Sequence, residues 1–360
     1  MKNIAIIFGG HSSEHEVSIN SARNIFKALD KTKFTPALIG VSKQGTWYAI
    51  NEKEFETLEA INDNKMAQAQ TLTLIRAQSK VFALNLQNQQ RQELDCAFAI
   101  IHGTNGEDGT MQGHLKILGL PFVGCGVMAS AIAMDKEVMK IVMTAAGIPN
   151  SRYMVLKSYE NPDFDQLVKN LGLPFFIKPA NAGSSVGVHK IKSKDEFTTK
   201  LKDSFKYDHK VIAEEFIDGR EVECSVMGLN QKPEAAMPGE LVVKHEFYSY
   251  EAKYLDPNGA EIIIPAKVTP EQTEQIRNLA VKTYQALYCD GLTRVDFFMK
   301  KDGSLTVNEI NTLPGFTKIS MYPMMWQAKG LGYSDLITKL IQLAFDKNDF
   351  ENRLNLDFRS

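Results

Sequence analysis

The sequence has few cysteines and almost no net charge. Its four cysteines lie far apart and form no C-x-x-C pair, which excludes a zinc ribbon and a disulfide framework and predicts reduced thiols. The formal net charge is -2, with 41 Lys and Arg against 43 Asp and Glu. This balance provides no basic field for a nucleic acid, so we expect no nucleic-acid partner.

Long apolar runs are also absent. No stretch approaches the roughly 18 residues of a membrane span, and the apolar run at 4–8 is too short for the core of a signal peptide. We therefore expect a soluble, cytoplasmic protein without a membrane partner.

The order of apolar runs and glycines predicts an α/β fold. The chain has 360 residues, 44% of them hydrophobic, which suits about two or three domains. A strand at 4–8, the pair Gly9-Gly10 and a helix from Ser18 to Asp30 form a β–loop–α unit of the doubly wound type. A second strand at 94–101 ends at His102, at the edge where such sheets bind ligands. Segment 51–92, rich in Gln and Asn, is predicted to be a peripheral insertion with little chemistry.

A second domain is expected after Gly126. Good helix formers at 129–146 predict one helix that ends at Gly147. A glycine-serine loop at 181–187 then lies between two predicted strands. Backbone N–H groups of such a loop can bind phosphates, with Lys178 as a point charge. The strand after the loop excludes a P-loop, which needs a helix there.

A predicted hairpin near the C-terminus brings four polar side chains together. Asp302-Gly303 separates two β-rich runs, which predicts a loop of these two residues. The resulting pairs are Lys301 with Ser304, Asp296 with Glu309, and Arg294 with Asn311. Because side chains alternate along a strand, the last two pairs project from one face of the hairpin. Their carboxylate and amide oxygens suit Mg²⁺, and the guanidinium can stabilise an oxyanion. A surface hairpin with cross-strand ion pairs is the alternative.

Two further motifs suggest other chemistry. Gly183-Ser-Ser185-Val-Gly187 matches the G-x-S-x-G of hydrolases, but a strand follows where the nucleophile elbow needs a helix. His11-Ser-Ser-Glu14-His15 matches the zinc motif H-x-x-E-H, but it precedes the predicted helix. A loop that directs Glu14 at a ligand and a capping role for the serines both remain open.

Taken together, an ordered series of segments resembles the ATP-grasp enzymes and, closely, the D-alanine–D-alanine ligases. It spans nearly the whole chain in the family's order and is far more specific than any single motif. The segments are GGHSSEHEVS at 9–18, HGTNGEDGT at 102–110, GVMASAIAMDK at 126–136, KPANAGSSVG at 178–187, YEAKY at 250–254, RVD at 294–296 and NEINTLPG at 308–315.

The resemblance implies a Rossmann-like N-terminal domain at 1–124, a central ATP-grasp domain at 125–214 and a C-terminal ATP-grasp catalytic domain at 215–360. It also implies that ATP phosphorylates one D-alanine and that the amine of a second attacks the acyl phosphate. The products are D-alanyl-D-alanine for peptidoglycan synthesis, ADP and phosphate. A homodimer is implied as well.

The resemblance also implies roles for individual residues. The expected metal ligands, for two Mg²⁺ or alternatively Mn²⁺ ions, are Asp296, Glu309 and Asn311. The expected ATP-binding residues are Lys136, Lys178, Ser185, Glu214, Ile217, Glu221 and Lys253. The expected catalytic and amino-acid-binding residues are Glu14, His102, Ser184, Tyr254, Arg294, Gly315, Ser320 and Met321. Segment 250–254 is expected to be a lid, and its sequence favours dipeptide over depsipeptide synthesis.

Two other functions remain as alternatives. One is a different ATP-grasp carboxylate–amine ligase, in which amino acids other than D-alanine would trigger ATP hydrolysis. The other is a nucleotide-binding regulatory protein without activity. Binding alone does not require both metal ligands and an oxyanion partner, so the presence of Asp296, Glu309 and Arg294 argues against the second.

Overall fold

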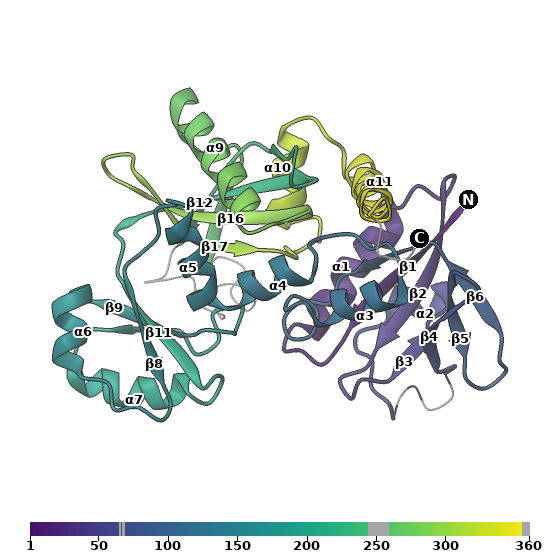
Figure 1. Ribbon diagram of the computed structural model, residues 1–360, viewed down its shortest axis with the longest axis horizontal. Helices are drawn as coiled ribbons and strands as arrows, with labels where there is room; N and C mark the ends of the chain where they lie inside the picture. The colour runs from purple at the N-terminus through teal and green to yellow at the C-terminus, as the bar shows by residue number, and fades with distance from the viewer. Residues whose placement is uncertain (65, 67–68, 244–258, 355–360) are drawn as a thin grey trace.

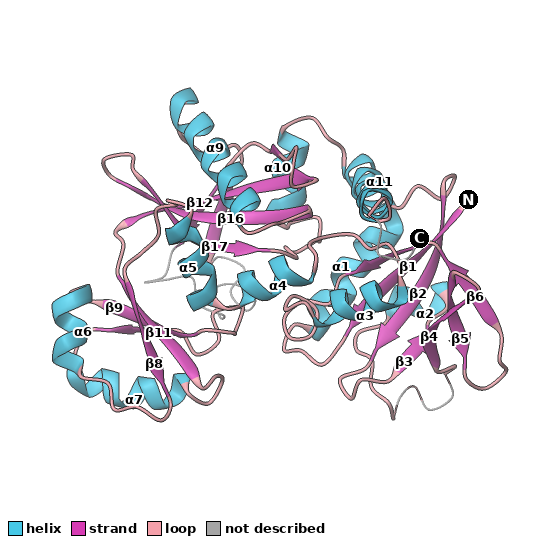
Figure 2. Cartoon of the chain, in the orientation of Figure 1, coloured by secondary structure: helices cyan, strands magenta, loops and turns pink. Residues whose placement is uncertain are grey.

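A computed structural model describes residues 1–64, 66, 69–243 and 259–354. These residues form four sheets that follow one another along the long axis of the molecule, with helices between and beside them (Figures 1 and 2). The predicted α/β class is confirmed by a mainly parallel N-terminal sheet flanked by helices. Among the described residues, no helix has the length and hydropathy needed to cross a membrane.

The N-terminal sheet has the strand order β3-β2-β1-β7. Its parallel strands are β1 (Lys2–Gly9), β2 (Phe34–Val41) and β7 (Cys96–Ala99), and β3 (Trp47–Ala49) is antiparallel to β2. The adjacent helices are α1 (His15–Ala28) and α3 (Thr110–Leu118). Segment 51–92 forms α2 (Glu52–Thr57) and most of a small antiparallel sheet of β4 (Leu72–Ala77), β5 (Lys80–Asn85) and β6 (Arg91–Leu94).

Two boundaries predicted for this region were wrong. Helix α1 begins at His15 rather than near Ser18. The Ser18 hydroxyl is buried, accepts from Gly9 N–H at 2.8 Å and donates to the Ile100 carbonyl at 2.6 Å, so it links α1 to two strand ends. The single strand at 94–101 is instead divided between β6 and β7. The side chain of Asp95 accepts from Asn3 N–H at 2.8 Å where the chain passes between the sheets.

The single helix predicted at 129–146 was also wrong. Two helices are present, α4 (Val127–Met134) and α5 (Lys136–Ala145). Asp135 between them is extended, and its carboxylate accepts from the N–H groups of Glu137 and Val138. This carboxylate also lies 2.6 Å from the Lys210 ammonium. The N-cap of α5 therefore interrupts a run of good helix formers.

The next sheet is antiparallel and has the order β10-β9-β11-β8. Its strands are β8 (Tyr153–Lys157), β9 (Phe175–Pro179), β10 (His189–Ile191) and β11 (Lys210–Glu215). Helices α6 (Phe164–Leu171) and α7 (Lys194–Ser204) pack on it around an apolar core that includes Phe175 and Phe197. The glycine-serine loop lies between β9 and β10, as predicted.

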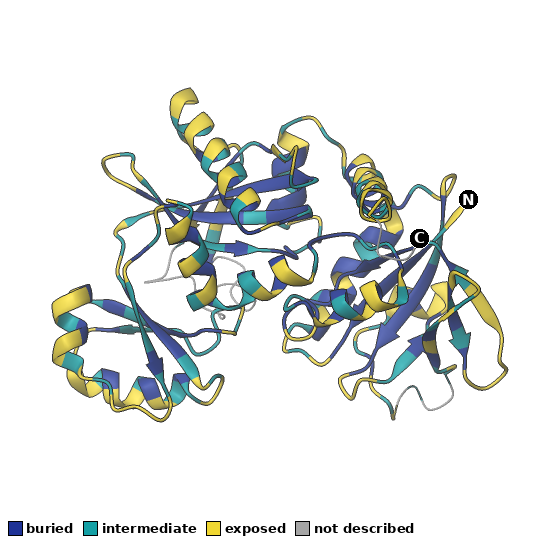
Figure 3. Cartoon of the chain, viewed as in Figure 1, coloured by how far each residue is buried: buried dark blue, intermediate teal, exposed yellow. Residues whose placement is uncertain are grey.

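The C-terminal sheet has the order β15-β14-β12-β16-β17, with β13 beside β12. Its strands are β12 (Gly219–Gly228), β13 (Glu234–Ala235), β14 (Gly239–Val243), β15 (Ala260–Ile263), β16 (Gly291–Lys300) and β17 (Leu305–Asn311). The accompanying helices are α9 (Pro270–Ala286) and α10 (Met321–Ala328). The sheet is buried over much of its length (Figure 3).

The β16–β17 hairpin has the predicted register at its polar end but a different loop. Asp296 pairs with Glu309 and Arg294 with Asn311, as predicted. At the loop, however, Lys300 N–H donates to the Ser304 carbonyl, so the pairing of Lys301 with Ser304 was wrong. The register shifts by one residue between Asp296 and Phe297, and this irregularity offsets the longer loop.

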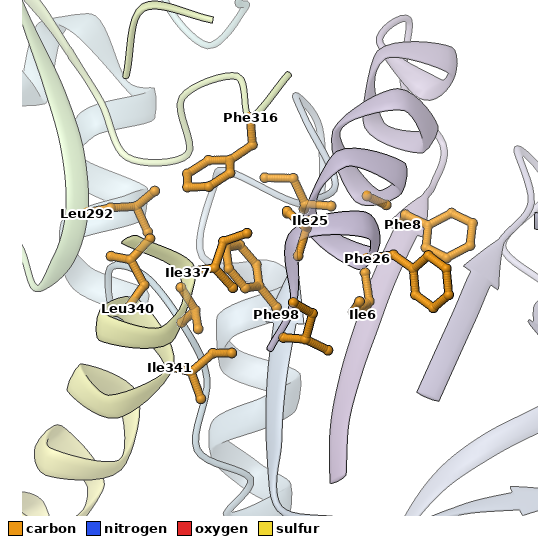
Figure 4. Packing of buried hydrophobic residues seen from close by; sticks show 14 of the residues in the cluster. Ile6, Phe8, Ile25, Phe26, Phe98, Leu292, Phe316, Ile337, Leu340 and Ile341 are labelled. Carbon is orange, nitrogen blue, oxygen red and sulfur yellow. The ribbon is translucent and has the colours of Figure 1, made fainter. Parts of the chain in front are cut away.

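Helix α11 (Tyr333–Glu351) returns to the N-terminal sheet and contacts α1, β7 and β16. Ile337 and Ile341 of this helix belong to the same core as Phe98 of β7 (Figure 4). Phe316, which follows β17, is fully buried in this core and packs edge to face against Phe98. The loop after β17 is thus fixed between the N-terminal and C-terminal sheets.

Candidate active site

Two cavities adjoin beside the C-terminal sheet. The larger, about 490 Å³, is lined by residues of the N-terminal sheet region and by 309–321. The smaller, about 440 Å³, is lined by residues of the β8–β11 sheet and of β12, β14 and β16. Arg294 and Glu309 line both cavities, so the hairpin forms their common wall.

The cavities bring together the predicted site residues from distant parts of the chain. The larger cavity is lined by Glu14, His102, Lys136, Ser184, Arg294, Glu309, Asn311, Gly315, Ser320 and Met321. The smaller is lined by Lys136, Lys178, Ser184, Ser185, Glu214, Ile217, Glu221, Arg294, Asp296 and Glu309. Lys253, Tyr254 and the predicted lid at 250–254 lie outside the described residues.

The loop before α1 directs Glu14 into the larger cavity. Glu14 occupies the N-cap position, but its side chain makes no capping hydrogen bond. The hydroxyl of Ser12 accepts from Glu14 N–H at 3.0 Å and so orders the loop. A Cβ atom on Gly103 would lie 2.7 Å from this hydroxyl and 3.2 Å from Glu14 Oε2, so the opposite loop needs glycine there. The expected capping role of the serines was wrong, because Glu14 and not a serine is the N-cap residue, whereas Glu14 lines the cavity as a loop directed at a ligand would place it.

The zinc interpretation of His11 and His15 is wrong. His15 is buried, with Nδ1 2.7 Å from the Gly10 carbonyl and Nε2 accepting from Ile61 N–H at 3.0 Å. Burial lowers the pKa of His15 below its ordinary value. His11 Nδ1 lies 2.6 Å from the Lys43 carbonyl. Both nitrogens of His15 are therefore used by the backbone and cannot bind a metal ion.

His102 connects the N-terminal part to the loop after β17. Its Nδ1 lies 3.2 Å from the Leu313 carbonyl and 3.5 Å from Glu107 Oε1, so this nitrogen carries a proton. Its Nε2 lies 2.9 Å from the hydroxyl of Ser21, which in turn accepts from Phe316 N–H at 3.4 Å. Burial lowers the pKa of His102, but hydrogen bonding and attraction to Glu107 outweigh it and raise the pKa.

The glycine-serine loop has left-handed backbone at both serines and leads into a strand. Ser184 and Ser185 have positive φ angles of 52° and 58°. Strand β10 follows, where the elbow would need a helix, so the structure contradicts a nucleophilic role for Ser185. Lys136 donates to the Ala182 carbonyl in this loop at 2.7 Å. The loop and a buried ammonium thus form one side of the smaller cavity.

A buried ionic cluster also lines the smaller cavity. Glu214 Oε1 lies 2.7 Å from the Lys140 ammonium, and Oε2 lies 2.5 Å from the Lys178 ammonium. Burial raises the pKa of Glu214, but Lys140 and Lys178 outweigh it and lower the pKa to about 2. Glu214 is therefore an ionised hydrogen-bond acceptor at neutral pH.

Arg294 lies between two carboxylates on the common wall. Its Nε and Nη2 donate to the two carboxylate oxygens of Asp296, each at 2.7 Å. Its Nε also lies 2.8 Å from Glu223 Oε2. Burial lowers the pKa of Arg294, but Asp296 and Glu223 outweigh it and raise the pKa well above its ordinary value. Arg294 thus remains a cation.

The hairpin carries donors that fit Mg²⁺. Asp296 and Glu309 face each other, and Asn311 lies two pairs further along, on the same face. The amide oxygen of Asn311 accepts from Leu313 N–H at 2.9 Å, and an amide oxygen has a second acceptor position. Within the described residues no group of three or more His, Cys, Asp or Glu forms a metal site. Two carboxylates and an amide suit a hard cation that also takes ligands from phosphate.

Gly315 lies where a side chain would not fit. A Cβ atom there would be 2.9 Å from Ser320 Oγ. The Ser320 hydroxyl accepts from Thr317 N–H at 3.0 Å, which fixes the turn before α10. The backbone of Gly315 therefore lines the larger cavity at close range.

Three residues with roles in this geometry were missed by sequence reasoning, namely Lys140, Ser21 and Glu223. Glu223 follows Glu221 by two positions in a strand, which places both on one face, so alternation could have identified it. Ser21 and Lys140 carry no motif, and only the tertiary structure reveals their contacts.

Comparisons with known proteins agree with this architecture. A family model described as the D-ala D-ala ligase N-terminus matches residues 3–125, and one described as the D-ala D-ala ligase C-terminus matches residues 142–342. The D-alanine–D-alanine ligase of Oceanobacillus iheyensis is 45% identical over 362 residues, and D-alanine–D-alanine ligase A of Escherichia coli is 44% identical over 357 residues. Each match covers 98% of both chains.

Solved structures give the same result. The D-alanine–D-alanine ligase from Coxiella burnetii superposes with a TM-score of 0.86 at 35% identity, covering 98% of this chain and 96% of that chain. The VanG D-Ala:D-Ser ligase from Enterococcus faecalis has a TM-score of 0.84 at 34% identity, covering 95% of this chain and 99% of that chain. The chain therefore belongs to the family of D-alanine–D-alanine ligases and has their ATP-grasp fold.

Proposed function

We propose that the chain joins two D-alanine molecules to D-alanyl-D-alanine, with conversion of ATP to ADP and phosphate, for peptidoglycan precursor synthesis. The observation that carries this proposal is the common wall between the two cavities. Lys178, Ser185 and Glu214 line only the smaller cavity, and Glu14 and the 313–321 region line only the larger one. Lys136 and Ser184 line both. A phosphoryl group held in the first can therefore meet a carboxylate held in the second at Arg294 and Glu309.

The smaller cavity is assigned to ATP. Lys136 and Lys178 bind phosphate oxygens, and the loop at Ser185 supplies backbone N–H groups. The base and ribose are received by three other residues of this lining, Glu214, Ile217 and Glu221. Lys253 is predicted to approach the γ-phosphate and lies outside the described residues.

Asp296, Glu309 and Asn311 would hold two Mg²⁺ ions, or alternatively Mn²⁺, and the bound ions supply charge that neutralises the phosphates. Arg294 is bound to Asp296 in this structure. We infer that Arg294 turns from Asp296 toward the reacting oxygen when a cation binds that carboxylate. Phosphoryl transfer depends mainly on such positioning and charge neutralisation.

The larger cavity is assigned to the amino acids. Glu14 binds the first ammonium, with His102 nearby. An oxygen of the first carboxylate forms a bond to the γ-phosphorus as the bond to the bridging oxygen breaks, and ADP leaves. The second amine then attacks the carbonyl carbon, loses a proton, and phosphate leaves. Arg294 and Gly315 N–H stabilise the intermediate oxyanion.

Binding of the second substrate and closure of the site complete the proposal. Ser320 and the Met321 backbone bind the second carboxylate. Ser184 joins Glu14 and Tyr254 in a hydrogen-bonded set that excludes water from the acyl phosphate. Tyr254 lies outside the described residues, so its part in the set stays a prediction.

We further propose a homodimer and domain boundaries at 124/125 and 214/215. The use of ATP and the buried free cysteines Cys96, Cys125, Cys224 and Cys289 support the cytoplasm as the compartment.

The experiment that tests the function is mass-resolved product formation from Mg-ATP and D-alanine, alone and with D-lactate or D-serine in competition. Equal amounts of D-alanyl-D-alanine and ADP would support the proposal. A preference for the depsipeptide or for D-alanyl-D-serine would overturn the assigned acceptor. If other amino acids alone trigger ADP release, the chain is a different carboxylate–amine ligase.

A further inference from the structure

Glu214 binds two ammonium groups that differ in their access to the cavity. Lys178 lines the smaller cavity, and 11% of its side chain is exposed. Lys140, one helical turn after Lys136 on α5, is fully buried and lies behind Glu214, outside the lining of both cavities. A ligand in the cavity can therefore reach Lys178 but not Lys140.

The surroundings of Lys140 are all internal. Its ammonium lies 2.7 Å from Glu214 Oε1 and donates to the Ser151 hydroxyl at 2.8 Å. It also lies 5.6 Å from the centre of the Tyr153 ring, within the range of a cation–π interaction. Ser151 in turn donates to Glu214 at 3.3 Å. An ammonium has three N–H groups, and these three internal partners satisfy the Lys140 ammonium without a ligand.

Lys178 is differently placed. Its ammonium is 2.5 Å from Glu214 Oε2, the oxygen that Lys140 does not bind. In the proposed function, Lys178 binds nucleotide phosphate, so it has to release this oxygen. Glu214 would then accept a hydrogen bond from the base through Oε2 while still buried and ionised.

We propose that Lys140 is a positioning residue for nucleotide binding, the permanent counter-ion that keeps Glu214 ionised and oriented when Lys178 moves to the phosphates. This inference rests on the proposed function. A buried carboxylate that loses its last cation is strongly destabilised. Without Lys140, Lys178 would stay on Glu214, and nucleotide binding would have to break that pair. The low pKa of Glu214, for which Lys140 is the first cause that opposes burial, is consistent with this role.

The proposal is tested with Lys140→Met, which keeps an unbranched chain of similar length. We expect the KM for ATP to rise by about ten- to a hundredfold, because one charge-assisted contact is lost. The KM for D-alanine should change by less than about twofold, since Lys140 acts only in the nucleotide cavity. The matched control is Lys169→Met on α6, where the lysine is exposed. Thermal unfolding of both variants reports whether they fold.

A double variant keeps the test valid if Lys140→Met folds poorly. Lys140→Met/Glu214→Gln removes both charges, so no uncompensated carboxylate is left. We expect it to bind ATP as Glu214→Gln alone does, because Lys140 acts through Glu214. Additive losses in the double variant would overturn the proposal, as would an unchanged KM for ATP in Lys140→Met. A parallel rise of both KM values would indicate general damage and would also overturn it.

Calorimetry with Mg-ATP separates this inference from the proposed function, because nucleotide binding needs no amino acid. If the wild type binds ATP but ligates other substrates, only the function assignment fails. If Lys140→Met binds ATP as tightly as the wild type, only the role of Lys140 fails.

Discussion

The contact between Glu223 and Arg294 predicts how the proposed binding of Mg²⁺ at Asp296 depends on a neighbouring carboxylate. In this structure Arg294 binds both oxygens of Asp296 and one oxygen of Glu223. A cation that takes Asp296 leaves Arg294 with Glu223. Glu223→Gln, which keeps the shape but removes the charge, should therefore hold Arg294 on Asp296 and oppose metal binding.

The size of this effect follows from the attraction between two buried charges, those of Glu223 and Arg294. Glu223 is buried, and its Oε2 lies 2.8 Å from Arg294 Nε as an ion pair without a hydrogen bond between these two atoms, because the single N–H of Nε is donated to Asp296. Two unit charges about 4 Å apart attract each other by about 4 kcal/mol at an effective dielectric constant of about 20, part of which offsets desolvation, so the apparent affinity for Mg²⁺ should fall by about tenfold or more. The maximal rate should also fall, because Arg294 is less well positioned for the oxyanion.

The assay is kcat/KM for D-alanine as a function of free Mg²⁺, together with direct Mn²⁺ binding by electron paramagnetic resonance. Glu234→Gln is the control, since Glu234 of the same sheet pairs with Lys329 at 2.6 Å, away from both cavities. An unchanged Mg²⁺ dependence and unchanged Mn²⁺ binding in Glu223→Gln would refute the reasoning.

Three further predictions concern the common wall and the loop after it. Glu309→Gln should lower turnover by more than about a hundredfold while circular dichroism stays unchanged, and wild-type turnover would refute the metal assignment. Gly315→Ala places a Cβ 2.9 Å from Ser320 Oγ, so kcat should fall by about ten- to a hundredfold; an unchanged kcat would exclude an oxyanion role for this backbone. The raised pKa of His102 beside Glu107 stabilises the folded state below the unfolded value of about 6.5, and this contribution is lost as pH rises through the folded pKa. The free energy of unfolding should thus fall with pH more steeply in the wild type than in His102→Gln between about pH 6 and 8, whereas equal slopes would contradict the assigned contact.

The β16–β17 hairpin shows what turn residues and strand alternation can and cannot predict. Asp302-Gly303 correctly predicted a turn, and the facing pair Asp296 and Glu309 was correct. The loop nevertheless contains one residue more than predicted, and a one-residue shift beyond Phe297 restores the register. Turn chemistry therefore located the hairpin, but the correct pairing depended on two irregularities that offset each other.

The break between α4 and α5 shows the opposite case. Helix propensity favoured a continuous helix, since 129–146 contains no Gly or Pro and many good helix formers. The break is stabilised by Lys210, whose ammonium lies 2.6 Å from Asp135 and 2.8 Å from Glu137. A contact between distant segments thus decided a local structure that propensity alone could not predict.

Helix α5 buries lysines and exposes an isoleucine, which is the reverse of the usual pattern and indicates anions beside its buried face. Lys136 and Lys140 are buried, whereas 53% of Ile141 is exposed. Two lysines four residues apart on a buried face require anions nearby, because a buried ammonium without one is costly. Lys140 has its anion in Glu214. Among the described residues Lys136 donates to the carbonyl of Ala182 and to no carboxylate, and burial lowers its pKa. The carboxylates of Glu309, Glu214 and Asp135 oppose this lowering without a direct hydrogen bond, so the ammonium keeps donor capacity, and we expect nucleotide phosphates to bind there.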